Sequence, residues 1–291
     1  MNKRNLLNLV LLLVVAGLGL LAWLEPGRRP EPQAVKITAL DPANIERIRI
    51  ERPADTVEMW RLSFNRFELV RRDGRWQLTA PMAAPANDLR TDAILSIATI
   101  ESLNQQPIAG LDLAGYGLAE PKARLQLDDV SIDFGAAAPL DNRRYVRVGD
   151  TLHLIPDLRY YQLIGHWSGY VSLRLLEEGL QLERIELPQL TLMNRDGSWT
   201  PEPTPEHWSA DAATLLAQRW SNVQALEVRE QREKTAGDEI RLYVRGREHP
   251  LRFVIAAREP DLVLARHDLG LAYHLIPSQA RELLELSVPQ Q

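Results

Sequence analysis

The segment Arg72-Asp73-Gly74-Arg75-Trp76 recurs 123 positions later as Arg195-Asp196-Gly197-Ser198-Trp199. A second segment, His153-Leu154-Ile155-Pro156, recurs 121 positions later as His274-Leu275-Ile276-Pro277. Two matches in the same order and with nearly the same offset indicate a tandem duplication of a unit of about 120 residues, the size of an ordinary domain. Asp-Gly is the preferred pair of a type I′ turn, so each copy predicts a tight β-hairpin with its glycine at positive φ.

Alternating apolar and polar residues surround both hairpins and predict short strands. Apolar residues at helical spacing follow each hairpin, from Leu89 to Leu103 in the first unit and from Ser209 to Val223 in the second. Four further short alternating strands then complete each unit. The sequence therefore predicts an α+β fold with two tandem repeats, each an antiparallel sheet of short strands with one main helix.

Residues 6–24 form an N-terminal run of 19 residues without a charged side chain. A helix of that length covers roughly 28 Å, close to the hydrocarbon thickness of a bilayer. The run lacks an Ala-x-Ala cleavage pattern and ends beside Trp23, which favours a retained signal anchor over a cleaved signal peptide. We expect residues 1–5 to be a cytoplasmic head, 6–24 a transmembrane helix and 25–40 a linker. The predicted location is the inner membrane, single-pass, with the C-terminal region periplasmic.

The charge balance excludes one class of partner. The chain has a formal net charge of −5, and residues 31–291 carry 30 basic and 38 acidic side chains. Binding to a phosphate backbone needs a basic face, so we expect no nucleic-acid partner.

Motifs for catalysis or metal binding are missing from the sequence. The six histidines show no zinc-ligand spacing, and there is no nucleophile elbow, Walker loop or dinucleotide fingerprint. His153 and His274 occupy the same place in the two matched segments, which predicts a structural role for both. We therefore predict no enzyme activity, and no catalytic, cofactor-binding or metal-ligating residue.

Aromatic residues divide into repeated and unrepeated ones. Trp76 and Trp199 recur directly after a hairpin turn, so we predict that they fill the core of each unit. Partner binding should instead use what breaks the symmetry of the duplication. The candidate partner-binding residues are the unrepeated Trp60, Phe64, Tyr116 and Trp167.

A Tyr-Gly-Leu-x-x-Pro turn at residues 116–121 precedes Ile132-Asp133-Phe134-Gly135 and the strand Arg144-Tyr145-Val146-Arg147-Val148. This pattern resembles the bacterial DUF4340 family over roughly residues 45–165. The second unit lacks the turn and matches only through the internal repeat. We accordingly predict a DUF4340-like repeat 1 over residues 41–170 and a repeat 2 over 171–291. The resemblance implies a membrane-anchored envelope protein, often encoded beside an ABC transporter with gliding-motility-type components.

Three functions fit these observations. The first is a non-enzymatic, membrane-anchored envelope accessory protein that binds a membrane protein such as an ABC-type transporter. The second is an envelope binding module that holds a glycan, peptide or lipid between the repeats, which exposed aromatic residues there would favour. The third is an envelope hydrolase with a carboxylate pair, which would need two carboxylates facing each other in a cleft. The lack of catalytic motifs favours the first.

Overall fold

The structure is a computed structural model that describes residues 12–20, 35–53, 65–139, 141–206, 208–231 and 233–286. It contains a nine-stranded, an eight-stranded and a two-stranded sheet, with only short helices beside them. The fold of the described residues is therefore mostly β, and the predicted α+β class is wrong. The reason is that the first predicted helix is shorter than its apolar pattern and the second has only 13 residues, while almost every alternating segment forms a strand.

The strands of each sheet are antiparallel to their neighbours. In spatial order, the first sheet consists of β5 (Ala84–Pro85), β4 (Arg75–Ala80), β3 (Arg66–Arg72), β2 (Arg47–Glu51), β8 (Ala123–Leu127), β9 (Val130–Ala137), β10 (Arg143–Val148), β11 (Thr151–Pro156) and β7 (Asn104–Pro107). The second consists of β14 (Ser198–Glu202), β13 (Leu190–Arg195), β12 (Leu182–Leu187), β16 (Glu239–Val244), β17 (Leu251–Ala257), β18 (Leu262–Arg266), β19 (Leu271–Leu275) and β15 (Glu227–Glu230). The small sheet pairs β1 (Val35–Lys36) with β6 (Glu101–Ser102).

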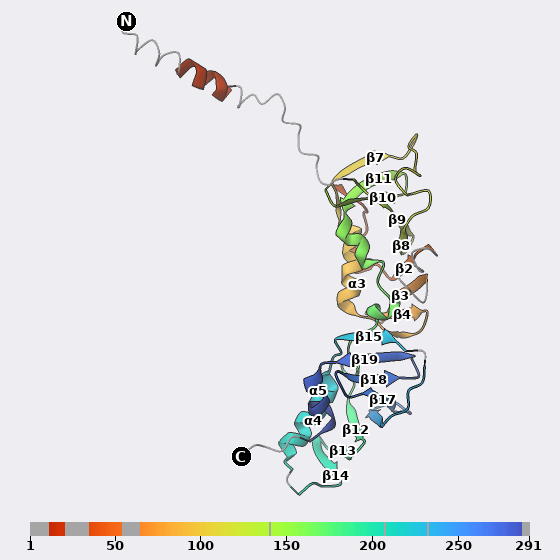
Figure 1. Cartoon of the computed structure of the whole chain (residues 1–291), viewed down its shortest axis with the longest axis vertical. Coiled ribbons are helices and arrows are strands. Elements are labelled where there is room, and N and C mark those ends of the chain that lie inside the picture. The colour runs from red at the N-terminus through yellow and green to blue at the C-terminus, as the bar shows by residue number, and fades with distance from the viewer. Residues whose placement is uncertain are drawn as a thin grey trace.

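The helices are short. The α-helices are α3 (Asp88–Leu95), α4 (Ala210–Asn222) and α5 (Pro277–Leu284), and the 3₁₀ turns are η1 (Pro42–Asn44), η2 (Ser96–Thr99), η3 (Asp157–Gln162) and η4 (Trp167–Tyr170). In Figure 1, α3 lies along one side of the first sheet, and α4 and α5 lie along the same side of the second. We call this the helix side of the molecule, and the opposite surface of the two sheets the sheet side.

The two large sheets share one strand order. From β4 through β7 in the first sheet, each strand has a counterpart in the second, from β14 through β15, and only β5 is extra. The hairpin turns also agree, with Asp73 and Gly74 at φ 50° and 77°, and Asp196 and Gly197 at 53° and 89°. These positive values confirm the predicted turn. Two units of one architecture therefore follow each other along the chain.

The helix predicted from Leu89 to Leu103 ends early. The side chain of Asn87 caps α3 by accepting a hydrogen bond from the Arg90 amide at 3.2 Å. The α-helix stops at residue 95 and continues only as the 3₁₀ turn η2. Glu101 and Ser102 then pair with β1, so the chain that follows the turn adopts a strand instead of a fourth helical turn.

The predicted transmembrane helix over residues 6–24 is not found, which corrects that part of the fold prediction. In the described part of the chain, no helix is long and apolar enough to cross a membrane. Residues 12–20 are helical, and nine helical residues cover about 14 Å, roughly half of a bilayer's hydrocarbon thickness. Residues 1–11 and 21–34 of the predicted head, anchor and linker lie outside the described residues.

One hydrophobic cluster runs through both units, from Ile37 near the start of the first to Leu283 in α5 of the second. Trp76 and Trp199 both belong to it, at 7% and 9% exposure, and each follows the glycine of its hairpin by two positions. The predicted core role of the two tryptophans is confirmed.

His153 and His274 lie on corresponding strands, β11 and β19, but on opposite faces of their sheets. His153 pairs with Val146, which pairs with the core residue Phe134, so its side chain faces the core. His274 pairs with Val263, one position away from the core residue Tyr273, and faces the sheet side. The two histidines therefore do not occupy one position, although their strands correspond. The cause is their place in the strand: His153 is the third residue of β11 and His274 is the fourth of β19, and a shift of one residue moves a side chain to the other face.

Candidate functional site

The two repeats are joined edge to edge by the connector, residues 163–176. On one side, the amide of Asn87 donates to the Tyr170 carbonyl at 2.7 Å, and that of Ser172 donates to the Pro85 carbonyl at 2.8 Å. On the other, the amide of Ala225 donates to the Leu173 carbonyl at 2.8 Å. The connector therefore bridges the β5 edge of the first sheet and the chain that enters β15 of the second. We call the connector, with residues 84–90 and 223–230 beside it, the seam.

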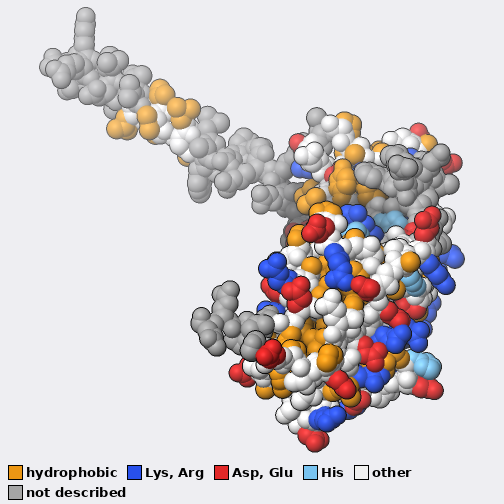
Figure 2. Space-filling view, turned by 60° about the horizontal axis from the view of Figure 1, so that its bottom comes forward, with side chains coloured by type: hydrophobic (Ala, Val, Ile, Leu, Met, Phe, Trp, Pro, Cys, Tyr) orange, Lys and Arg blue, Asp and Glu red, His pale blue; other side chains and the backbone are white. Residues whose placement is uncertain are grey.

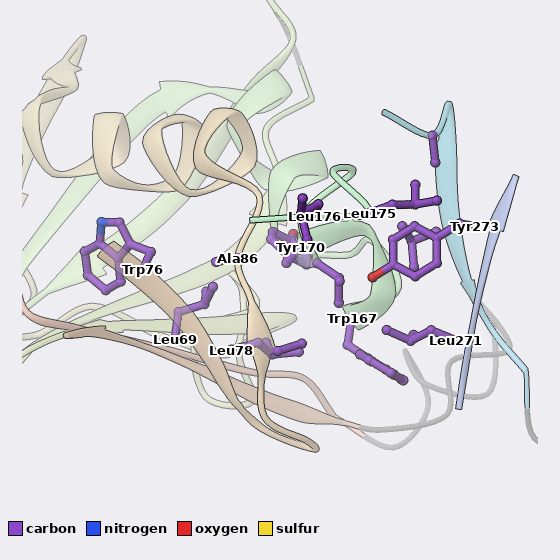
Figure 3. Packing of buried hydrophobic residues seen from close by; sticks show 14 of the residues in the cluster. Leu69, Trp76, Leu78, Ala86, Trp167, Tyr170, Leu175, Leu176, Leu271 and Tyr273 are labelled. Carbon is purple, nitrogen blue, oxygen red and sulfur yellow. The ribbon is translucent and has the colours of Figure 1, made fainter. Parts of the chain in front are cut away.

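Buried aromatic residues hold the seam together. Tyr170 is 2% exposed, and its ring lies 4.5 Å from that of Phe67 on β3. Its hydroxyl donates to the Gln162 carbonyl, and burial raises the pKa of Tyr170 to about 12, so the phenol stays neutral. Figure 3 shows Trp167 between the Leu78 region of the first repeat and Leu271 of the second. The seam is thus a packed interior that fixes the two repeats relative to each other.

A buried arginine secures the connector from the first repeat. Arg52, just after β2, is 3% exposed, and its guanidinium donates to the carbonyls of Leu163 and Gly165 at 3.3 and 2.7 Å. Burial lowers the pKa of Arg52, but an arginine remains charged at neutral pH. These two hydrogen bonds place the start of the connector over the end of β2.

One ion pair crosses the seam. His166 Nε2 of the connector lies 3.3 Å from Glu230 Oε2 on β15. The other ring nitrogen, Nδ1, accepts from the Ser168 amide at 3.2 Å and lies 2.9 Å from the Ser168 hydroxyl. Ser168, His166 and Glu230 are in contact and have the residue types of a hydrolase triad. Ser168, however, is only 3% exposed. The imidazole caps the 3₁₀ turn η4 through Nδ1, so this arrangement positions the connector and leaves no accessible nucleophile.

A cleft of about 460 Å³ opens at the seam. Its walls come from both repeats, and its floor is η4. The lining residues are Asn87, Arg90, Gly165, His166, Ser168, Gly169, Tyr170, Leu173, Leu226, Glu227, Val228, Arg229 and Glu230. We call it the seam cleft. Its size is typical of ligand pockets.

The charges in the seam cleft are mostly paired within the protein. Glu227 accepts a hydrogen bond from Arg229, and Glu230 faces His166. Arg90, on the first turn of α3, has no ion pair or side-chain hydrogen bond to the described residues. The cleft therefore carries one guanidinium whose charge no neighbour in the described structure offsets.

A second, smaller hollow of about 260 Å³ also lies where the repeats meet. Pro81, Met82, Trp167 and Leu269 give it an apolar lining, and His267 and Lys234 lie at its edge. Trp167 is 3% exposed, so only a small part of its ring reaches this hollow.

The candidate residues named from the sequence fall in different places. Trp60 and Phe64 lie outside the described residues. Trp167 is in the seam but buried, instead of lying on the surface as expected for a partner-binding residue. Tyr116 is half-buried against β9 and β10, with its ring 4.8 Å from that of Tyr145. Tyr116 and Trp167, the two candidates among the described residues, therefore lie in different parts of the molecule.

The Tyr116 turn has a structural reason for its sequence. The carbonyl of Tyr116 accepts from the Ala136 amide at 2.8 Å, so the turn packs directly on β9. Gly117 lies at φ 66°, and a Cβ there would come within 2.7 Å of the Ala136 amide nitrogen. A Cβ on Gly135 would collide with the Tyr116 carbonyl oxygen. The turn can therefore pack on β9 only with glycine at position 117 in the turn and at position 135 in the strand.

Sequence reasoning missed the residues that shape the seam cleft. His166 and Glu230 are 64 positions apart, and Arg90 and Arg229 are 139 apart, so no local spacing links either pair. Over the described ranges, no three histidine, aspartate or glutamate side chains form a group that could hold a metal ion.

Comparison with known proteins gives one match. The family model of a domain of unknown function, DUF4340, matches residues 76–240. The matched region runs from β4 through the whole connector to β16, so it contains the seam and extends beyond the 45–165 range of the predicted resemblance. No curated protein matches the chain, and no solved structure does.

Proposed function

The chain belongs to the DUF4340 family, and we propose that it is a non-catalytic interaction protein, in which two rigidly joined repeats present one continuous helix side to a protein partner. The observation that carries this proposal is the distribution of exposed large apolar side chains. In the first repeat, Leu89 on α3 and Leu158 on η3 are 80% and 74% exposed, and Tyr161 on η3 is also exposed. In the second, Leu215 on α4, Ile276 before α5 and Leu226 before β15 are exposed. Exposed apolar residues that gather on one side of a protein mark an interaction surface.

The sheet side has a different character. Arg49 lies 3.6 Å from Glu68 and donates to Gln126 at 3.4 Å in the first repeat. In the second, Glu186 lies 3.2 Å from Arg184 and 3.4 Å from Arg241. Figure 2 shows basic and acidic side chains interspersed over the face that it presents. These charges are paired with one another, so the sheet side is suited to contact with water.

The rigid seam joins the helix sides of the two repeats into one continuous surface. Because the connector and its aromatic residues fix the repeats, apolar residues of both repeats can be presented to one partner without a loss of interdomain freedom on binding. We place this partner in the cell envelope and take an ABC-type transporter as its class, on the strength of the family resemblance alone.

The two alternative functions receive less support. Among the residues that line the seam cleft, Tyr170 is the single aromatic and it is buried, which does not suit stacking on a sugar ring. The two glutamates of the cleft are each paired with a basic side chain and do not face each other as an acid and a base would.

Site-specific photocrosslinking in cells that produce the full chain tests the proposal. A photoreactive residue at Leu158 or Leu215, on the helix side, should give a discrete crosslinked partner. The same residue at Arg49 or Arg184, on the sheet side, should give none. Leu158→Ser should reduce the yield of the partner at least tenfold, whereas Leu103→Ser, which removes an exposed leucine between β6 and β7, should leave it unchanged. Crosslinks from the sheet side alone, or hydrolysis of an envelope polymer by the purified chain, would contradict the proposal.

A further inference from the structure

The seam cleft combines several features that suit a ligand. It lies at the junction of the repeats, it is open, and it contains both a guanidinium without an ion pair in the described structure and apolar lining residues. This inference rests on the proposed function, because it names the part of the partner that the molecule recognises.

The first feature is the uncompensated charge of Arg90. Arg229, on the opposite repeat, is engaged by Glu227, and His166 is engaged by Glu230. A ligand that enters the cleft therefore meets one free cation from the first repeat, with a second arginine on the far wall. An arginine binds a carboxylate through two parallel hydrogen bonds, which gives both strength and orientation.

The second feature is the apolar part of the lining. Leu226 lines the cleft and is 64% exposed. Leu173 and Val228 also line it. A free small carboxylate would satisfy Arg90 but would leave Leu226 in water. A segment with aliphatic residues next to its carboxylate would cover Leu226 as well.

The third feature is the space above η4. A Cβ built on Gly169 meets no atom within 4 Å, and Gly169 has an ordinary backbone conformation. Gly169 therefore lines the cleft without filling it, and a ligand can approach the backbone of η4 closely.

From these features we infer that the seam cleft binds an acidic, aliphatic segment of the protein partner, with a glutamate or aspartate side chain of the partner on Arg90 and aliphatic residues against Leu226. Because the walls belong to different repeats, the segment binds only where the seam is intact. The partner thereby contacts the first repeat, the connector and the second repeat at once.

The probe for this inference is an acetylated, amidated hexapeptide of alternating leucine and glutamate, titrated into the full chain by calorimetry. Two further probes serve as controls, the same peptide with glutamine in place of glutamate, and free glutarate. The leucine–glutamate peptide should bind at least tenfold more tightly than either control, and its affinity should fall with added salt because the contact with Arg90 is ionic.

Variants of the chain locate the binding. Arg90→Glu reverses the charge of the cleft, and Gly169→Leu fills it, so each should weaken the peptide at least tenfold. Arg195→Glu is the matched control, since Arg195 is an exposed hairpin arginine remote from the seam, and it should stay within twofold of the wild type. Thermal melts establish that each variant is folded. Arg90→Gln, which removes the charge without reversing it, replaces Arg90→Glu if that variant melts early.

Equal binding of the glutamine peptide, equal binding of glutarate, or undiminished binding to Arg90→Glu and Gly169→Leu would each overturn the inference. The proposed function is separable from it. If crosslinks from Leu158 and Leu215 persist while the peptide does not bind the cleft, the interaction surface stands and the seam cleft is not its recognition site.

Discussion

The two repeats share their strand order, yet they place opposite charges at one position on the sheet side. In the first repeat, Asp133 on β9 lies beside Arg124 on β8, with 2.6 Å between Oδ1 and Nε, and beside Arg147 on β10, at 2.5 Å. Its side chain is 3% exposed. In the second, the corresponding residue is Arg252, which pairs across the strands with Arg241, is 65% exposed and lies 3.9 Å from Glu239.

This difference shows that two repeats with the same strand arrangement can carry different side chains at one position. The backbone ladder fixes which residues are neighbours, but it does not fix the sign of their charges. Burial would raise the pKa of Asp133, but the hydrogen bonds from Arg124 and Arg147 outweigh it and leave the pKa below its ordinary value. In the second repeat, Arg252 is exposed to water, so its neighbours form no hydrogen bonds with it as strong as those of Asp133.

The next position differs for a steric reason. Gly135 on β9 corresponds to Val254 on β17, since each follows a core phenylalanine that pairs with β8 or β16. The Tyr116 turn packs on Gly135 in the first repeat, and the second repeat lacks that turn. The glycine is therefore needed where the turn exists.

The largest expected change in the free energy of unfolding comes from giving position 135 the valine that the second repeat has at position 254. Gly135→Val puts a branched side chain against the Tyr116 carbonyl and the Leu118 side chain, which should lower the free energy of unfolding by about 3 kcal/mol or more. Val254→Gly is the reciprocal control, and it should cost only about 1 kcal/mol. Urea unfolding measures both. Similar values for the two variants would mean that the turn does not depend on the glycine.

A somewhat smaller effect should come from the buried carboxylate. Asp133→Asn leaves two guanidinium groups without their anion, although both are partly exposed and can be hydrated. We expect a loss of about 2 kcal/mol in the free energy of unfolding. Arg252→Gln should cost less than about 0.5 kcal/mol, because surface ion pairs contribute little. Equal losses at the two positions would show that burial does not distinguish the repeats here.

The hairpins should behave alike, because their turns share one geometry. Gly74→Val and Gly197→Val each force a β-branched residue into a positive φ and should each cost about 1 to 2 kcal/mol. A Cβ at either position meets no atom within 4 Å, so the cost is conformational and should not depend on the repeat. Thermal melts that differ strongly between the two variants would contradict this equivalence.

The smallest effect is a pH dependence that separates the two histidines. Burial lowers the pKa of His153, and burial followed by the charge of Arg229 lowers that of His274. The unfolded chain therefore binds protons more readily, and the free energy of unfolding falls as the pH drops from about 7 through the ordinary histidine pKa near 6.5.

His153→Gln should flatten this slope more than His274→Gln, because His153 faces the core at 4% exposure and His274 faces the sheet side. His249→Gln, at an exposed position, is the control for the loss of a histidine side chain. The measurement is the melting temperature between pH 7.5 and 5.5. A larger flattening of the slope by His274→Gln than by His153→Gln would contradict the assignment of His153 as the more buried histidine.

Much of the local structure was predictable from the sequence. The Asp-Gly hairpins, the burial of Trp76 and Trp199, and the repetition of the strand pattern all follow from turn preferences and from residues close together in the chain. The length of α3 was not predictable in this way, since Glu101 and Ser102 leave the helical pattern only to pair with β1.

Of the candidate site, almost nothing was predictable. Trp167 was predicted to bind a partner because it is an unrepeated aromatic, yet it is buried in the seam. The sequence did not predict that Arg90, His166 and Glu230 line a cleft, because their roles arise from contacts between segments far apart in the chain.

The sequence by itself determined that this protein is a duplication with two tight hairpins, because turn chemistry and apolar alternation act over a few residues. Tertiary structure decided which face His153 and His274 occupy, since His153 is the third residue of its strand and His274 the fourth, and one position reverses the face. It also decided that Asp133 is buried and that a cleft opens between the repeats. Those outcomes depend on which strands and connectors pack together, and packing is a property of the whole chain.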